Sequence, residues 1–166
     1  MLFASFLRLI RIEGRIKMTT FNGTISFTIK AAKKLTDTDT TLFNISGKDL
    51  TDPLVVIEIN GVEVFRTDYI NNCLDPVWKS DNTHDHEANE SIREILIDVK
   101  DKETIGTECV GGKSFVGDEL KAFAKDKKID GWFRLRSKSG KGEYLAQSEV
   151  HFEMKYNTKI VGNATV

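Results

Sequence analysis

The sequence predicts an all-β domain, an eight-stranded antiparallel β-sandwich with one short helix between its late strands. Two observations carry this prediction. Several segments alternate apolar and polar residues with a period of two, as half-buried strands do, and turn-forming residues separate them at short intervals. One stretch, DELKAFAKD, has helical character. Many short strands with a single helix favour two packed antiparallel sheets over a parallel α/β sheet.

Length and composition fit one domain with its own core. The chain has 166 residues, of which 40% are hydrophobic and 30% are charged, and this is enough apolar material for one core. The formal charge is -1, so no overall basic field points to a nucleic acid as partner. Since no apolar run approaches the ~20 residues that span a bilayer, we expect a chain that is soluble or peripheral to a membrane.

The expected domain covers residues 21–156, with an extension at 1–20 and a flexible tail at 157–166. In the extension, Arg8, Arg11 and Arg15 fall on one stripe of a helix, opposite apolar residues. Two interpretations stay open. The extension is either an amphipathic anchor or targeting helix, or an unstructured segment that precedes a natural start at Met18.

The first strand is predicted from Gly23 onward, where Ile25, Phe27 and Ile29 alternate with polar residues. Residues 33–51 follow as a polar stretch that is longer than most connecting loops, which favours a functional loop. The apolar run LVVIEI then meets Asn60-Gly61 and continues as VEVFRT. An Asn-Gly step between two such runs predicts a hairpin with a type I′ turn.

The second half of the chain predicts four more strands. Residues 79–90 are polar and are expected to connect strands, with solvated histidines at His84 and His86. A strand ends at Asp101, and the loop DKETIGTECVGGK separates it from a short strand at residues 114–116. The helix DELKAFAKD, a strand around WFRL and the regularly alternating strand EVHFEMKY complete the order.

Several of these stretches, in this order, resemble the C2 domain family: GTISFTIKAAKKL, TDPLVVIEI, LDPVW, LIDVKDKETIG, WFRL and EVHFEMKY. The start FNGTISFTI and the long first loop look most similar to the amino-terminal C2 domain of novel protein kinases C. The resemblance covers about residues 21–156. It implies a sandwich whose loops at one end carry aspartates that bind calcium and bridge to lipid phosphate.

Matched by position, the resemblance implies calcium ligands at Asp52, Asp101 and Glu103. The long first loop could bring Asp49 near them, or alternatively Asp39 or Asp37. Two further family positions depart from the pattern, because they hold Ser46 and Cys109. Calcium takes about six to eight oxygen ligands, so these departures leave one weak site at most. The alternative is that Asp52 and Asp101 are turn residues.

Membrane contact in this family also uses apolar side chains at the loop tips. Leu42 and Phe43 in the first loop, and Ile105 and Val110 in the third, are apolar residues within polar segments. They are the candidate lipid-binding residues, although Phe43 could instead fold back onto the edge of the sandwich. The family's basic strand is absent here, because VEVFRTDY holds only Arg66 among acids, so a phosphoinositide site on that face is not expected.

The sequence predicts no enzyme. GTECVGGKS falls short of a phosphate-binding loop because Thr107 stands where glycine is required, and no catalytic pair has motif context. The resemblance implies a monomeric cytoplasmic module that docks peripherally on anionic phospholipid, with at most weak dependence on calcium. The alternative is a calcium-independent protein-protein interaction module. Asp52, Asp101 and Glu103 favour the first function, and Ser46 and Cys109 favour the second.

Overall fold

The computed structural model describes residues 17–37, 50–79, 82–103 and 105–159. The elements in chain order are β1 (Thr19–Thr20), β2 (Gly23–Lys33), β3 (Pro53–Ile59), β4 (Val62–Arg66), β5 (Thr83–Ala88), β6 (Ser91–Ile92), β7 (Glu94–Lys102), β8 (Thr107–Val116), α1 (Asp118–Asp126), β9 (Lys128–Arg136), α2 (Ser137–Gly140) and β10 (Tyr144–Thr158).

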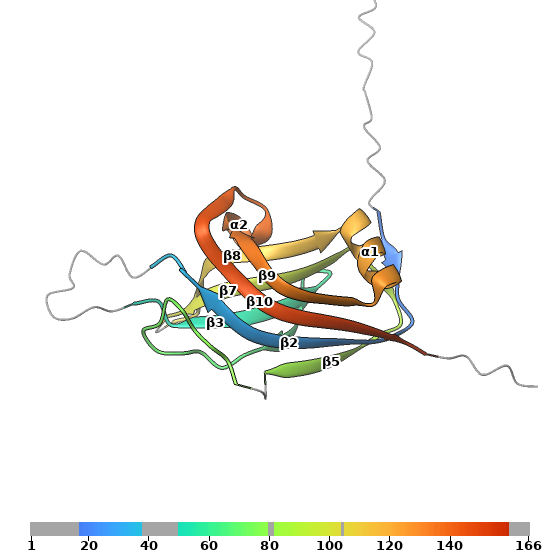
Figure 1. Cartoon of the computed structure of the whole chain (residues 1–166), viewed down its shortest axis with the longest axis horizontal. Helices are drawn as coiled ribbons and strands as arrows, with labels where there is room; N and C mark the ends of the chain where they lie inside the picture. The colour runs from blue at the N-terminus through green and yellow to red at the C-terminus, as the bar shows by residue number, and fades with distance from the viewer. Residues whose placement is uncertain (1–16, 38–49, 80–81, 104, 160–166) are drawn as a thin grey trace, which may run out of the picture.

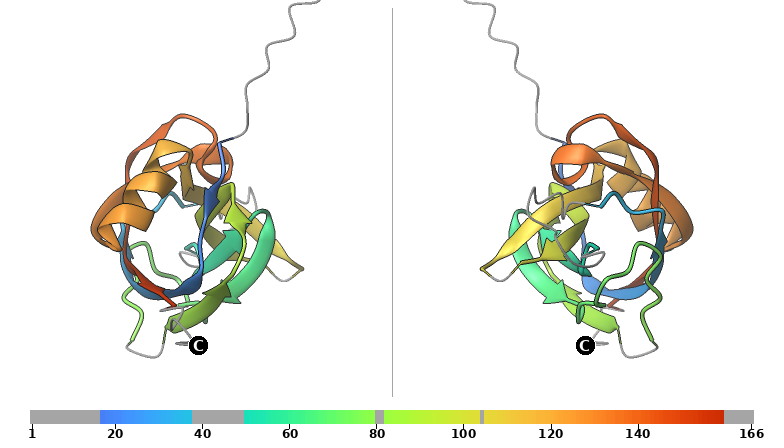
Figure 2. Two further views of the ribbon diagram at one scale, coloured as in Figure 1. Left: turned by 90° about the vertical axis from the view of Figure 1, so that its right-hand side faces the viewer. Right: turned by 90° about the vertical axis from the view of Figure 1, so that its left-hand side faces the viewer.

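Eight strands form one antiparallel sheet in the order β4-β3-β7-β8-β9-β10-β2-β5, and β1 pairs with β6 in a separate ribbon. The sheet curls, so that its two halves, β4-β3-β7-β8 and β9-β10-β2-β5, face each other as the layers of a sandwich (Figure 2). The halves join where β8 meets β9, a junction we call the seam. The predicted eight-stranded antiparallel sandwich is confirmed.

The core lies between the two halves, and the period-two pattern explains how it is filled. In β2 the side chains of Ile25, Phe27 and Ile29 are buried, while the residues between them are half-buried. Phe152 of β10 lies between two other aromatic rings, with centroid distances of 5.9 Å to Phe115 and 4.6 Å to Phe133. Such offset and edge-on ring contacts add to the stabilisation from burial.

The predicted helix is observed as α1, at the end of the sandwich that also carries β1 (Figure 1). Leu120 and Phe123 are its buried residues, and they cover this end of the core. The helix ends where Lys127 takes a left-handed conformation with φ 62° and donates its N–H to the Phe123 carbonyl at 2.8 Å.

The Asn-Gly hairpin is also as predicted. Asn60 and Gly61 both have positive φ, 54° and 82°, which a type I′ turn requires. The Asn60 side chain fixes the turn to its surroundings, because its Oδ1 accepts the Arg93 N–H at 2.8 Å. The turn therefore lies beside the start of β7.

Two expectations about the strands were wrong. Residues 79–90 do not merely connect strands, because they contain β5, which pairs with β2 at the edge of the sheet. The solvation expected of His84 does not hold either, since its ring stacks on Phe65 at a centroid distance of 5.3 Å. The short strand expected at residues 114–116 is much longer, because β8 begins at Thr107. Residues 83–88 and 107–113 contain few apolar residues, so the sequence pattern does not mark them as strands. They form strands because they pair with β2 and β7, respectively.

The segment α2 is a tight turn against β8. Lys138 and Ser139 have φ values of 51° and 50°, and Gly140 has 80°, so three consecutive residues are left-handed. Glycine is favoured at two places in this contact, because a Cβ on Gly112 would lie 2.9 Å from the Asp98 Oδ1 and one on Gly140, which has a positive φ, would lie 3.0 Å from the Ser114 nitrogen. The turn is thus held close to the sheet by its backbone.

The strands extend slightly beyond the domain boundaries that the sequence suggested, since β1 starts at Thr19 and β10 ends at Thr158. None of the helices in the described part of the chain is long and apolar enough to cross a membrane.

Candidate functional site

The candidate site lies at the end of the sandwich opposite α1, where the segments after β2, before β3 and after β7 meet (Figure 1). We call this end the rim and define it by Asp52, Asn72, Asp101, Glu103 and Ile105. Pro53 pairs with Asp101 across the β3–β7 ladder, so Asp52, which directly precedes β3, lies beside Asp101 of β7. The two residues that the sequence placed at one end therefore lie together.

Asp101 is buried, with 1% of its surface exposed, and its carboxylate holds the rim backbone in place. Its Oδ1 accepts the Asp52 N–H at 2.7 Å, and the Asp52 carbonyl accepts the Lys102 N–H at 3.0 Å. A charge-assisted bond of this kind is among the stronger contacts in a protein. Asp101 thus joins the end of β7 to the segment that enters β3.

The Asp52 carboxylate also accepts a backbone N–H, in this case from the loop between β4 and β5. Its Oδ1 accepts the Asn72 N–H at 2.7 Å, and the Asn72 side chain in turn accepts the Leu50 N–H at 2.7 Å. Asn72 has a positive φ of 50°, a conformation that asparagine tolerates better than most residues. The Asp52 carboxylate therefore fixes the loop between β4 and β5 against the entry to β3.

The third loop is short, because β7 continues to Lys102 and β8 starts at Thr107. The Glu103 N–H bonds to the Gly106 carbonyl at 3.2 Å, and the Lys102 ammonium donates to the Glu103 carbonyl. Ile105 lies at the tip with 93% of its surface exposed. An apolar side chain in this position has little contact with the rest of the protein.

The carboxylates in the described part of the rim do not make a calcium site by themselves. No group of three or more His, Cys, Asp or Glu residues that could hold a metal occurs within residues 17–37, 50–79, 82–103 and 105–159. Asp52 and Asp101 each use an oxygen to accept a backbone N–H, whereas calcium takes about six to eight oxygen ligands. The other candidate ligand, Asp49, lies outside the described residues, as do the lipid-binding candidates Leu42 and Phe43.

The assignment of Val110 to lipid contact was wrong. Val110 is 5% exposed and belongs to the core, because β8 begins three residues earlier than this side chain. Cys109 is also a strand residue, paired with Lys100. Its thiol accepts the Ser139 N–H at 3.3 Å on the outer face of the sheet. It is therefore remote from the tip of the third loop, where the resemblance implied an aspartate.

Sequence reasoning missed a second buried carboxylate, Asp98 in the middle of β7, which is 1% exposed. Its Oδ2 accepts a hydrogen bond from the Ser139 hydroxyl at 2.9 Å and lies 3.6 Å from the Lys100 ammonium. Burial raises the pKa of Asp98 above its usual value, and the Ser139 hydrogen bond partly offsets this. An aspartate inside the apolar run ILIDV was the available signal.

The family comparison agrees with this architecture. A family model described as the C2 domain matches residues 23–135. Phospholipase D gamma 2 of Arabidopsis thaliana is 33% identical over 96 residues, which are 58% of this chain and 11% of that protein. Phospholipase D gamma 1 of the same plant is 26% identical over 145 residues, 78% of this chain and 16% of that protein. The chain thus spans a small part of each of these relatives.

Solved structures share the fold at low sequence identity. The calcium-bound pair of C2 domains of extended-synaptotagmin 2 superposes with a TM-score of 0.65 and 20% identity, over 84% of this chain and 47% of that pair. A single C2 domain of a plant extended synaptotagmin 1 gives a TM-score of 0.56 and 18% identity, over 85% of this chain and all of that domain.

Proposed function

The chain belongs to the C2 domain family, and on that premise we propose that it docks peripherally on anionic phospholipid membranes through the rim. The observation that carries the proposal is the third-loop tip, where Ile105 is almost fully exposed at the end of two paired strands. Transfer of an isoleucine side chain from water into the membrane interface contributes roughly 1.5–3 kcal/mol. The candidates Leu42 and Phe43 of the first loop would add to this contact.

Calcium has a secondary place in the proposal. Asp52, Asp101 and Glu103, together with Asp49, are the residues proposed to hold one weakly bound ion, which would supply positive charge next to lipid phosphate. The hydrogen bonds already made by Asp52 and Asp101 support a weak site in preference to a strong one. Docking by the apolar tip does not depend on the ion.

The test is co-sedimentation with phosphatidylserine vesicles, in chelator and in calcium. Ile105→Ser should weaken partitioning by about tenfold or more, in both conditions and without loss of stability. Val62→Ser is the matched control, because Val62 is also exposed, at 66%, but lies next to the hairpin turn at the other end of β3. Equal loss in both variants, or no sedimentation of the wild type in either condition, would contradict docking by the rim.

We further propose that the domain is a non-catalytic monomer that reaches the membrane from the cytoplasm, and that residues 21–156, with the strand ends at 19–20 and 157–158, form its folded part. Light scattering tests the monomer, and cell fractionation with and without calcium tests the location. The finer similarity to novel protein kinases C stays a prediction. A protein partner is the alternative to lipid. The arginines of β9 at the seam, Arg134 and Arg136, favour this alternative.

A further inference from the structure

The seam leaves two strand edges open. β8 and β9 form one backbone pair, Gly112 with Arg136, and within the described residues no other rung joins them. From that pair β8 continues to Val116, and β9 arrives from Lys128. Each strand is paired on its other side only, β8 with β7 and β9 with β10. Open edges of this kind present N–H and C=O groups to which another strand can bond.

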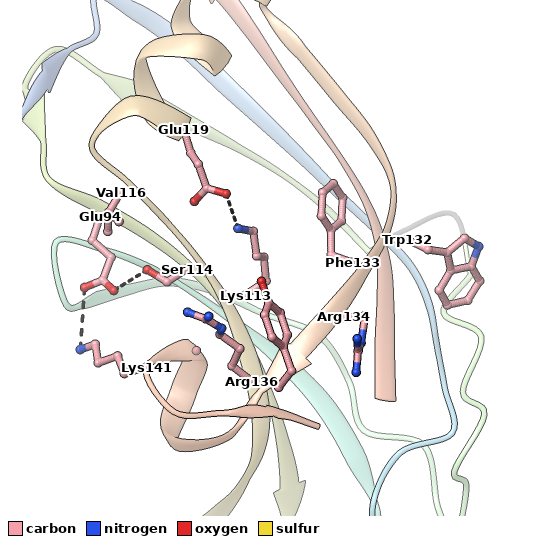
Figure 3. A pocket seen from close by; sticks show the side chains of 12 residues that line it. Glu94, Lys113, Ser114, Val116, Glu119, Trp132, Phe133, Arg134, Arg136 and Lys141 are labelled. Carbon is pink, nitrogen blue, oxygen red and sulfur yellow. Dashed lines mark hydrogen bonds and ion pairs between the residues drawn. The ribbon is translucent and has the colours of Figure 1, made fainter. Parts of the chain in front are cut away.

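A groove of about 690 Å³ lies at the seam (Figure 3). Its size is in the range of about 300–1,000 Å³ typical of ligand sites. The polar and aromatic side chains that matter here are Lys113 and Ser114 of β8, Arg134 and Arg136 of β9, and Lys141 and Tyr144 beyond α2. The groove is thus bounded by both open strands and by α2.

The acidic residues of the groove already have partners. The Lys113 ammonium lies 2.6 Å from Glu119. Glu94 accepts the Ser114 hydroxyl at 2.7 Å and lies 3.9 Å from the Lys141 ammonium. Figure 3 shows these pairs on either side of Arg136. The two lysines and the two glutamates therefore cancel in charge, which leaves the charges of the arginines.

Neither arginine has a carboxylate partner in the part of the chain that the structure describes. Both lie over the Tyr144 ring, with the guanidinium carbon 5.2 Å from its centroid for Arg134 and 4.2 Å for Arg136. Arg134 donates to the carbonyls of Leu145 and Ala146. The Arg136 Nε is buried and has no hydrogen-bond partner. A buried donor of this kind is costly unless an acceptor reaches it.

We propose that the seam groove binds an extended acidic segment of a partner protein, which adds as a strand to the open edge of β8 or β9. The planar guanidinium groups match carboxylates, with which they form paired hydrogen bonds. Arg134 and Arg136 are two residues apart on one strand, a spacing of about 7 Å. Alternate residues of a bound strand have the same spacing, so two of its carboxylates can meet both arginines. The backbone edges and the arginines together favour a peptide over a single small anion.

The position of the groove allows both surfaces to be used together. β8 starts at the rim with Thr107 and reaches the seam pair at Gly112, and the groove continues from there toward α1. A segment bound in the groove would leave Ile105 uncovered. The groove proposal therefore does not depend on membrane docking, and either can fail alone.

The test uses the full chain and a fluorescein-labelled octapeptide of alternating glutamate and threonine, with a twin that has lysine in place of glutamate. Fluorescence anisotropy at low salt should show binding of the acidic peptide only. Arg136→Gln should weaken it at least about tenfold, the size expected when a charge-assisted hydrogen bond is lost. Arg93→Gln, which changes an exposed arginine outside the groove, should change the affinity less than about twofold.

Amide hydrogen exchange provides the second measurement, since an added strand should slow exchange at residues 113–116 or 128–135. This signal does not rely on a variant that folds. Equal binding of both peptides, equal binding by Arg136→Gln, or no binding of the acidic peptide would overturn the proposal. Full displacement of the peptide by inorganic phosphate at constant ionic strength would also overturn it, in favour of a small-anion site.

Discussion

The rim carries carboxylates whose hydrogen bonds are satisfied within the protein, whereas the seam carries arginines, one of which has a donor without a partner among the described residues. At the rim, the carboxylates of Asp52 and Asp101 accept backbone N–H groups from neighbouring segments. At the seam, Arg136 has a buried Nε without a hydrogen-bond partner among the described residues. The acids at the rim thus stabilise the fold, whereas the arginines at the seam can serve a ligand. The resemblance to the C2 family suggested a different assignment, because it implied that Asp52 and Asp101 bind calcium and it gave the arginines at the seam no role.

The largest expected effect concerns a pair of glycines, one in each region. Gly140 at the seam has φ 80° and a Cβ there would lie 3.0 Å from the Ser114 nitrogen, while Gly106 at the rim has φ 85° and open space around it. Gly140→Ala should lower the free energy of unfolding by about 3 kcal/mol, from backbone strain plus overpacking. Gly106→Ala should lower it by about 1 kcal/mol, from strain alone. Urea denaturation measures both, and equal costs would show that α2 can move away from β8.

The next effect tests whether the rim carboxylate is structural. Asp101→Ala should cost about 2 kcal/mol, because the partly buried Asp52 N–H then loses its acceptor. Asp101→Asn keeps an acceptor oxygen and should cost clearly less. If the two variants unfold at the same urea concentration, the Asp52–Asp101 hydrogen bond does not stabilise the rim.

A pH-dependent effect is expected at Asp98, which connects β7 to the wall of the seam through Ser139. Burial raises the pKa of Asp98 above 3.8, so its contribution to stability is present below that pH and is lost as the pH rises through the folded-state pKa. Asp98→Asn keeps an acceptor for Ser139 but does not ionise. The stability of the variant relative to wild type should therefore increase as the pH rises above 3.8 and through the folded-state pKa of Asp98. A difference that stays constant with pH would mean that the burial of Asp98 imposes no cost on its ionised form.

The smallest expected effect is on the seam arginine itself. Arg136→Gln should change the free energy of unfolding by no more than about 1 kcal/mol, because the lost contact with the Tyr144 ring is offset by removal of a buried donor that has no partner among the described residues. Thermal unfolding followed by circular dichroism measures this. A loss as large as that of Asp101→Ala would show that Arg136, like the rim acids, is mainly structural.

The sequence predicted those features that depend on local patterns. Alternation identified β2 and β10, Asn60-Gly61 identified the hairpin, and the helical character of DELKAFAKD identified α1 with its observed bounds. The meeting of Asp52 and Asp101 is a contact between distant segments, and it was expected only because the resemblance to the C2 family implied it. The signals for β2, β10, the hairpin and α1 are each contained within one segment of the chain.

Features that depend on contacts between distant segments were not predicted. β5 forms in a polar segment because β2 pairs with it, and Val110 is buried because β8 starts before it. The seam groove exists because β8 and β9 share a single backbone pair. The residue pattern of neither strand predicts that the two strands separate beyond this pair. The left-handed turn of α2 likewise depends on Asp98 and the two glycines.

The turn in α2 has a consequence for how the sequence can vary. Lys138 and Ser139 hold a left-handed conformation that is unfavourable for lysine and serine, and Ser139 is held there by Asp98 and by the thiol of Cys109. Three positions that are far apart along the chain therefore constrain one another. In the evolution of this protein, we expect exchanges at 98, 109 and 139 to be accepted together and to be rejected singly.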